Sequence, residues 1–160
     1  MILLLIACFA TLCTSLYIDW HSSYGEYSPV FMERSELEKS VFYVAGKREL
    51  ENPGKIYSRA PYIFINERYK GVHVIDNTDP SKPINVGFIV APGCIDMAVK
   101  GEVMYLDNAI DLVAIDLNTK KVTHRQKDVF PEPNAPNGSY YHVYNRPSQT
   151  SVLVAWKKNQ

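Results

Sequence analysis

Three short blocks of this sequence occur twice, and each second copy follows the first after about 40 residues. The pairs are PGKI at 53–56 with PGCI at 92–95, RAPYIFIN at 59–66 with KGEVMYLD at 100–107, and GVHVID at 71–76 with DLVAID at 111–116. Aligning the copies pairs Phe64 with Tyr105 and Val74 with Ala114. A period near 40 residues with four strands per unit is typical of β-propeller blades. The sequence therefore predicts an all-β fold: about two four-stranded antiparallel propeller-like blades, an incomplete β-propeller, after a short helix.

The residue pattern inside the copies predicts strands. Apolar and polar residues alternate at 62–66 and at 71–76, which is the period of a half-buried strand. A further strand is expected at 84–90. The segment DNTDPSKP at 76–83 lies between two of these runs and is dense in turn-forming residues. Each copy is therefore expected to fold as an up-and-down unit of short strands.

The regions around the two copies have patterns of their own. Ser35 and Glu38 fit a capping box, which predicts a short helix near 35–42. The residues before this helix are polar and aromatic without periodicity, and they predict a tether. The expected organisation is a signal or anchor at 1–18, a tether at 19–34, a short helix and loop at 35–52, repeats at 53–91 and 92–130, and a loop with a partial third repeat at 131–160. Strands are expected at 140–144 and 151–156 in this last part.

The first 18 residues, MILLLIACFATLCTSLYI, carry no charged side chain. Their second half is too polar for a bilayer span, which needs about 20 mostly apolar residues, so the stretch is interpreted as an export signal. LIAC at 5–8 resembles a bacterial lipobox and makes Cys8 the candidate lipidation site. Cys13 is a poorer candidate because the bulky Leu12 precedes it. An uncleaved anchor and an ordinary buried element are the alternatives.

Charge and cysteine content exclude several classes of function. Lys+Arg and Asp+Glu are equal at 17, and no basic stripe is interleaved with aromatic residues, so nucleic acid is not expected as a partner. Cys94 is the one cysteine after the leader, so neither an internal disulfide nor a thiolate zinc site is expected. It is interpreted as a small apolar residue at a strand start rather than a nucleophile. The sequence also contains no G-x-S-x-G elbow and no P-loop, and no cofactor is expected.

The acidic residues at the strand ends are the first candidates for chemistry. Asp76 and Asp116 end equivalent strands, and equivalent residues of successive blades point the same way instead of converging. We therefore expect them to cap turns rather than to act as acid and base. Asp76, Asn77 and Asp79 together suggest a Ca²⁺ loop, but the spacing of an EF-hand is absent, and no metal is expected.

The histidines and a group of tyrosines are the remaining candidates. His21, His73, His124 and His142 are scattered, and none has the spacing of a helical zinc pair. His73 alternates with valines and is expected to be a solvated or cross-strand residue. Tyr140, Tyr141 and Tyr144 are expected to be ordinary strand residues, with a sugar-stacking surface as the alternative. NGS at 137–139 matches an N-glycosylation acceptor.

The repeated blocks resemble the LVIVD-repeat proteins. The resemblance rests on VHVID at 72–76, followed by the turn NTDPSKP at 77–83, and on LVAID at 112–116. The stretch from the capping box to Phe130 resembles the Bacteroidetes lipoproteins of this family, with NPGKIY at 52–57 among the matching blocks. The resemblance implies a propeller fold, a longer chain, and a periplasmic or outer-membrane lipoprotein of the cell envelope with no assigned reaction.

Two classes of function therefore remain open. The first is a non-catalytic binding or scaffold module that is held on the envelope by a lipid or an N-terminal anchor and has a protein or glycan ligand. The second is an enzyme whose site would need further blades, and a fragment of a longer gene is a third possibility. Two blades alone leave two broad apolar faces uncovered, because a blade buries its faces only against neighbouring blades. An open, frayed stack, self-association through these faces, or a truncated remnant is expected.

Overall fold

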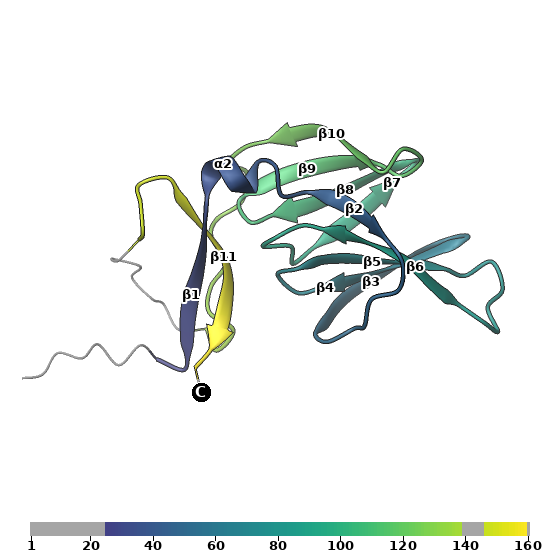
Figure 1. Cartoon of the computed structure of the whole chain (residues 1–160), viewed down its shortest axis with the longest axis horizontal. Helices are drawn as coiled ribbons and strands as arrows, with labels where there is room; N and C mark the ends of the chain where they lie inside the picture. The colour runs from purple at the N-terminus through teal and green to yellow at the C-terminus, as the bar shows by residue number, and fades with distance from the viewer. Residues whose placement is uncertain (1–24, 139–145, 160) are drawn as a thin grey trace, which may run out of the picture.

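The computed structural model describes residues 25–138 and 146–159, and its regular secondary structure is almost entirely β (Figure 1). In chain order the elements are β1 (Tyr27–Glu33), α2 (Arg34–Leu37), β2 (Phe42–Ala45), β3 (Pro53–Arg59), β4 (Tyr62–Glu67), β5 (Gly71–Asp76), β6 (Ile84–Val90), β7 (Met97–Lys100), β8 (Val103–Asn108), β9 (Asp111–Asp116), β10 (Lys121–Gln126) and β11 (Ser151–Lys158). All paired strands run antiparallel. The predicted all-β, antiparallel fold class is therefore confirmed.

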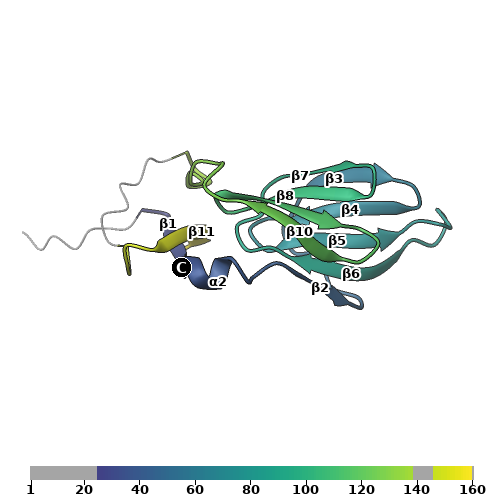
Figure 2. The ribbon, with the colours of Figure 1, turned by 90° about the horizontal axis from the view of Figure 1, so that it is seen from above.

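Two of the three sheets correspond to the two sequence copies. The first sheet has the order β2-β6-β5-β4-β3, and the second has the order β10-β9-β8-β7. In the first sheet Phe64 lies opposite Val74, and in the second Tyr105 lies opposite Ala114, as the alignment of the copies requires. Each copy thus forms a four-stranded up-and-down unit, and the two units stack without closing, in an incomplete propeller-like arrangement (Figures 1 and 2).

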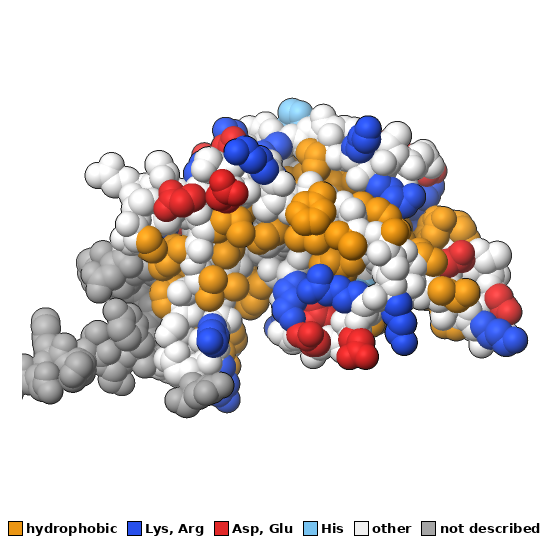
Figure 3. Space-filling model, viewed as in Figure 1, with side chains coloured by type: hydrophobic (Ala, Val, Ile, Leu, Met, Phe, Trp, Pro, Cys, Tyr) orange, Lys and Arg blue, Asp and Glu red, His pale blue; other side chains and the backbone are white. Residues whose placement is uncertain are grey.

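The two sheets bury opposite faces against each other. Phe64, Val72 and Val74 of the first sheet share one apolar cluster with Met104 and Leu106 of the second, and none of the five is more than 7% exposed. Burial of each such side chain contributes about 1.5–3 kcal/mol. Hydrophobic side chains also gather across the middle of the molecular surface in Figure 3, with charged side chains above and below them. Apolar packing between the sheets therefore holds the two units together.

Polar bonds between β3 and β7 support this packing. The Tyr57 hydroxyl donates to the carbonyl oxygen of Val99 at 2.9 Å, from the first sheet to the second. Two ion pairs flank this bond, Lys55 with Asp96 and Arg59 with Glu102. Each pair is largely exposed and contributes about 0–1 kcal/mol to the free energy of unfolding. These pairs therefore align the two strands more than they stabilise the fold.

The ends of the described chain form a third, two-stranded sheet. β1 pairs with β11, and this ribbon lies at one end of the two stacked sheets (Figures 1 and 2). Its side chains pack on the β8–β9 turn through Ala109 and Ile110, and on the β4–β5 turn through Tyr69. The indole Nε1 of Trp156 donates to the carbonyl oxygen of Pro133 at 2.8 Å. The ribbon therefore spans the same end of both sheets.

This ribbon corrects two expectations from the sequence. The tether was expected to include residues 27–33, but these residues form β1. The strand expected at 151–156 exists as β11, yet it pairs with β1 and belongs to no third four-stranded unit among the described residues. The partner strand lies more than a hundred residues away, so no local pattern in β1 reveals the pairing.

The helix is shorter than the capping box indicates. The described helix covers Arg34–Leu37, and Glu33 occupies the N-cap position without a side-chain hydrogen bond to the helix. Residues 42–45, which the sequence placed in a helix and loop, form β2 on the edge of the first sheet. A single turn is stable here because Leu37 is fully buried against the ribbon.

Candidate binding site

The outer face of the second sheet is an open, apolar surface. Ala98, Tyr105 and Leu112 alternate with core residues of β7, β8 and β9, so their side chains point away from the first sheet. Together with Ile95 and Phe130 they line a hollow of about 400 Å³. Ile95, Tyr105 and Phe130 are 37–40% exposed. Such a concave patch of exposed apolar side chains is typical of an interaction surface.

Two carboxylates lie in this hollow. Asp107 accepts hydrogen bonds from the backbone N–H groups of Ile95 and Asp96, at 2.9 and 2.8 Å. Burial raises the pKa of Asp107 above its ordinary value, although these N–H bonds oppose the change. Asp96 is half exposed and pairs with Lys55 at the rim. The hollow on the second sheet is therefore apolar with an acidic rim.

The outer face of the first sheet is also partly open. Phe42, Val44 and Ile56 are 47–67% exposed on its strands. The rest of the face is covered by the loop between β2 and β3, whose Arg48 guanidinium lies 4.2 Å from the centre of the Phe88 ring. The expectation that both broad faces are wholly uncovered is therefore wrong for this sheet, because its own loop folds back over it.

A buried polar pair anchors that loop. The Glu67 carboxylate accepts the backbone N–H groups of Glu51 and Asn52, and it lies 3.2 Å from Nε2 of His73. Asn85 donates to the other ring nitrogen, so the proton of the neutral imidazole lies on Nε2. Burial holds the pKa of His73 below its ordinary value, against the opposing effect of Glu67. His73 is thus a fully buried cross-strand residue and not a solvated one.

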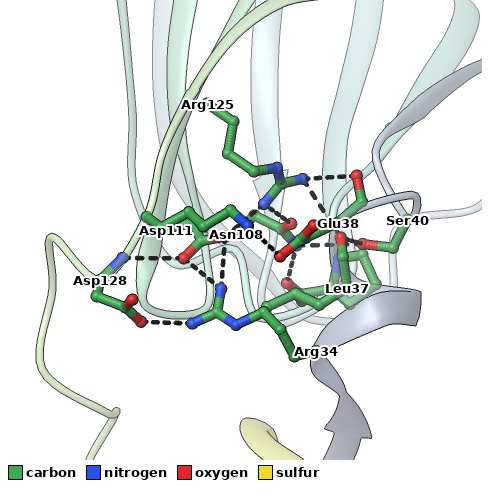
Figure 4. A network of polar contacts seen from close by, with 10 residues as sticks. Arg34, Leu37, Glu38, Ser40, Asn108, Asp111, Arg125 and Asp128 are labelled. Atoms are coloured by element: carbon green, nitrogen blue, oxygen red, sulfur yellow. Dashed lines mark hydrogen bonds and ion pairs between the residues drawn. The ribbon is translucent and has the colours of Figure 1, made fainter. Parts of the chain in front are cut away.

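A second buried network joins α2 to the second sheet (Figure 4). Asp111, at the start of β9, is fully buried and accepts two bonds from Arg34 and one from Arg125, at 2.7–2.9 Å. The backbone N–H of Asp128 also donates to it. Burial opposes ionisation of Asp111, but these donors hold its pKa below the ordinary value. Arg125 reaches on to the carbonyl oxygen of Leu37, so the network fixes α2 against β9 and β10.

Both strand-end aspartates cap turns. Asp76 accepts the backbone N–H and the hydroxyl of Thr78, at 2.9 and 2.6 Å. Asp116 accepts the backbone N–H groups of Asn118 and Thr119. These bonds hold the pKa values of both carboxyls below their ordinary range. The turn-capping role predicted from the sequence is confirmed for both residues.

Cys94 is a buried residue of the loop before β7. It is fully buried, and burial raises the pKa of its thiol well above the ordinary value, with Asp107 adding to the effect. The side-chain amide of Asn66 donates to its sulfur at 3.3 Å. A protonated, enclosed thiol of this kind has little nucleophilic reactivity.

The other sequence candidates have no shared site in the described part of the chain. His124 is exposed on β10, and Asp79 caps its own turn through Ser81. Cys8, Cys13, His21, His142, Tyr140, Tyr141, Tyr144 and Ser139 of the glycosylation triplet lie outside the described residues. Within residues 25–138 and 146–159, no group of His, Cys, Asp and Glu side chains is placed to hold a metal ion.

The sequence did not reveal the two buried polar networks. Glu67 and Asp111 are both charged residues at a strand end, which is where charged residues are normally solvated. Their partners come from elements far away in the chain, namely the β2–β3 loop for Glu67 and α2 for Asp111. The one available signal was their place in the strand pattern, where Glu67 shares a strand face with Ile65 and Asp111 shares one with Val113.

Comparison with family models, with curated proteins and with solved structures found no match to this chain. In the part of the chain that the structure describes, no helix is both long and apolar enough to cross a bilayer.

Proposed function

We propose that this chain is a non-catalytic scaffold module of the cell envelope that binds a second copy of itself through the two outer faces of its sheet stack. The observation that carries the proposal is the open apolar hollow of about 400 Å³ on the second sheet. The same face of the first sheet is covered by the second sheet. A sheet that is apolar on one face buries that face against another layer, and within one chain no such layer covers the described outer face of β7–β10.

Charge supports the choice of a second copy as the occupant. The hollow on the second sheet has Asp96 and Asp107 at its rim. The loop on the open face of the first sheet carries Lys47 and Arg48, which outnumber its Glu49, while its Glu51 pairs with Lys70. Docking the first sheet of one copy on the second sheet of another therefore opposes basic and acidic side chains, which favours this orientation.

Such a contact continues the packing already present inside the chain. The two sheets of one copy stack with non-equivalent faces in contact, so a second copy that docks in the same way adds further units in the same direction. The contact is head-to-tail, because different faces meet, and head-to-tail contacts produce rings where they close and filaments where they do not. A propeller assembled from several copies is one such closed ring.

Two complementary variants test this proposal. Tyr105→Lys places a cation on the second sheet opposite Lys47 and Arg48, and Ile56→Glu places an anion on the first sheet opposite the acidic hollow. Each variant alone should remain monomeric in sedimentation from about 1 μM to about 1 mM, whereas the native chain should associate. A mixture of the two should form a one-to-one dimer, because each retains one intact face.

Val30→Lys is the matched control, since Val30 is 38% exposed on the ribbon and away from both outer faces. It should associate like the native chain. A native chain that stays monomeric throughout this range, or a mixture of the two variants that does not dimerise, contradicts the proposal. Circular dichroism of each variant establishes that it is folded.

The envelope location is proposed from the leader and from the LVIVD resemblance. Lipidation at Cys8 would hold the module on the membrane, because a multiply acylated cysteine anchors a chain by itself. Cells fed a labelled fatty acid should label the native chain and Cys13→Ser but not Cys8→Ser. Label that persists in Cys8→Ser, or that is absent from the native chain, refutes lipidation at this residue without affecting the self-association proposal.

A further inference from the structure

A cavity of about 240 Å³ lies between the two sheets, at the strand ends opposite the β1–β11 ribbon. Its floor is apolar and comes from both sheets: Phe64, Val74 and Ile89 from the first, and Ile115 from the second. These four side chains are all at least nine-tenths buried. The walls nearer to the solvent are Tyr43 and Leu117. The cavity is separate from the outer faces, so it is accessible whether or not copies associate through them.

The size of the cavity fits one ring and a short chain. An apolar cavity of about 150 Å³ is large enough to bind benzene in a protein core. The cavity here is larger and has aromatic rings on two sides, since Tyr43 and Phe64 both line it. The four floor side chains offer no hydrogen-bonding group, so the inner part of the cavity favours an apolar ligand group over a sugar or a nucleotide.

The mouth of the cavity carries one cation, Lys120, and one carboxylate, Asp76. Lys120 lies at the mouth with its ammonium nitrogen 5.2 Å from the centre of the Tyr43 ring. Among the described residues it forms no ion pair. Asp76 also lies at the mouth, but Thr78 already satisfies its Oδ1 atom with two hydrogen bonds. The two charges at the mouth balance, and the Lys120 ammonium is the group there that can pair with an anionic group on a ligand.

We infer that this cavity binds a small amphiphilic carboxylate, with an aromatic ring between the sheets and the carboxylate at Lys120. The ring contacts Phe64 and Tyr43, and the short chain passes Leu117 to reach the ammonium group. The carboxylate replaces part of the water around Lys120 and adds an ion pair to the cation–π contact that already orients this side chain.

A series of probes with one body and three head groups tests the inference. 3-Phenylpropionate, 3-phenylpropanol and 3-phenylpropylamine share the ring and chain and differ in charge. Binding to the purified full chain is measured by ligand-observed NMR and by calorimetry. The carboxylate should bind most tightly, the alcohol about fivefold more weakly, and the amine most weakly, because a partly exposed ion pair contributes up to about fivefold in affinity.

Two variants and a control locate the site. Lys120→Gln should lower the affinity for 3-phenylpropionate to that of the alcohol, whereas Lys121→Gln, at the neighbouring exposed lysine, should leave it unchanged. Leu117→Trp should fill the cavity and abolish binding of all three probes. An amine that binds as tightly as the carboxylate, binding that survives Leu117→Trp in a folded variant, or no binding of any probe at millimolar concentration overturns the inference.

Discussion

Phe64 and Tyr105 occupy the same register position in the two sheets but differ in burial, at 1% and 37% exposure. Phe64 lies opposite Val74, and Tyr105 lies opposite Ala114. The stack therefore has a direction: one face of the first sheet meets the opposite face of the second, and the face that carries Tyr105 has no covering sheet in the described chain. Equivalent residues of a repeat thus contribute differently to the free energy of unfolding, because a neighbouring sheet covers one of them and not the other.

The two residues should respond differently to truncation. Phe64→Ala removes a fully buried ring from the core between the sheets and should lower the free energy of unfolding by about 3–5 kcal/mol. Tyr105→Ala should lower it by less than about 1 kcal/mol in dilute solution, because much of this ring is already in water. Urea unfolding at low protein concentration measures both values. Equal losses would show that the outer face is covered in solution.

The buried Asp111 network should be a major source of stability. Asp111→Asn removes the charge that Arg34 and Arg125 share, and breaking a buried pair by removing one partner costs about 3–5 kcal/mol. Asp128→Asn is the matched control, because Asp128 is 67% exposed and its carboxylate pairs with Arg34 at the surface, so loss of its charge should cost less than about 1 kcal/mol. Thermal unfolding of the two variants should differ by several degrees. A similar fall in melting temperature in both variants would show that the buried charge of Asp111 is not a major source of stability.

Acidification should destabilise the chain in two steps. Burial holds the pKa of His73 below its ordinary value of 6.5, so the unfolded chain binds more protons just below pH 6.5. This contribution is complete above pH 6.5 and is lost as the pH falls through the lowered pKa. Glu67 and Asp111 have lowered pKa values as well, so a second loss follows below their ordinary values of 4.5 and 3.8.

Urea unfolding between about pH 7.5 and about pH 5 measures the first step. The slope of stability against pH should decrease in His73→Gln, whereas His124→Gln, at an exposed histidine, should keep the native slope. If the two variants show the same slope, the destabilisation does not arise from His73.

Cys94 should be unreactive in the folded chain. Its thiol is fully buried and its pKa is raised well above the ordinary value, so the reactive thiolate is scarce and enclosed. In a variant that carries Cys8→Ser and Cys13→Ser, a chromogenic disulfide reagent should react with Cys94 only at the rate of unfolding. In strong urea the reaction should be complete within minutes. Fast reaction under native conditions would show that the loop before β7 opens locally.

The strands of the two repeats could be predicted because their information is local. Alternation at 62–66 and 71–76 sets which residues share a face of the sheet, and the turn between Asp76 and Pro83 fixes where the strand ends. The alignment of the copies then fixes the register, and the pairing of Phe64 with Val74 and of Tyr105 with Ala114 follows it.

The missed elements depend on partners that are distant in the chain. β1 is a strand because β11 supplies its hydrogen bonds and the turns of both sheets cover its apolar side chains. β2 is a strand because its backbone forms hydrogen bonds with the edge strand β6 of the first repeat. The candidate hollow was predicted only as an uncovered face, since its shape depends on the loop around Phe130 that folds over one side of it.

The sequence by itself determined the all-β class, the two four-stranded units, their register and the turn-capping aspartates. These features follow from side-chain alternation and turn chemistry, which act between residues close together in the chain. The tertiary structure alone decided which face of each unit is buried, that Glu67, His73 and Asp111 are buried and paired, and that the ribbon spans the ends of both sheets. The physical reason is that burial and ion pairing are properties of neighbours in space, and here those neighbours come from the β2–β3 loop, α2 and β11.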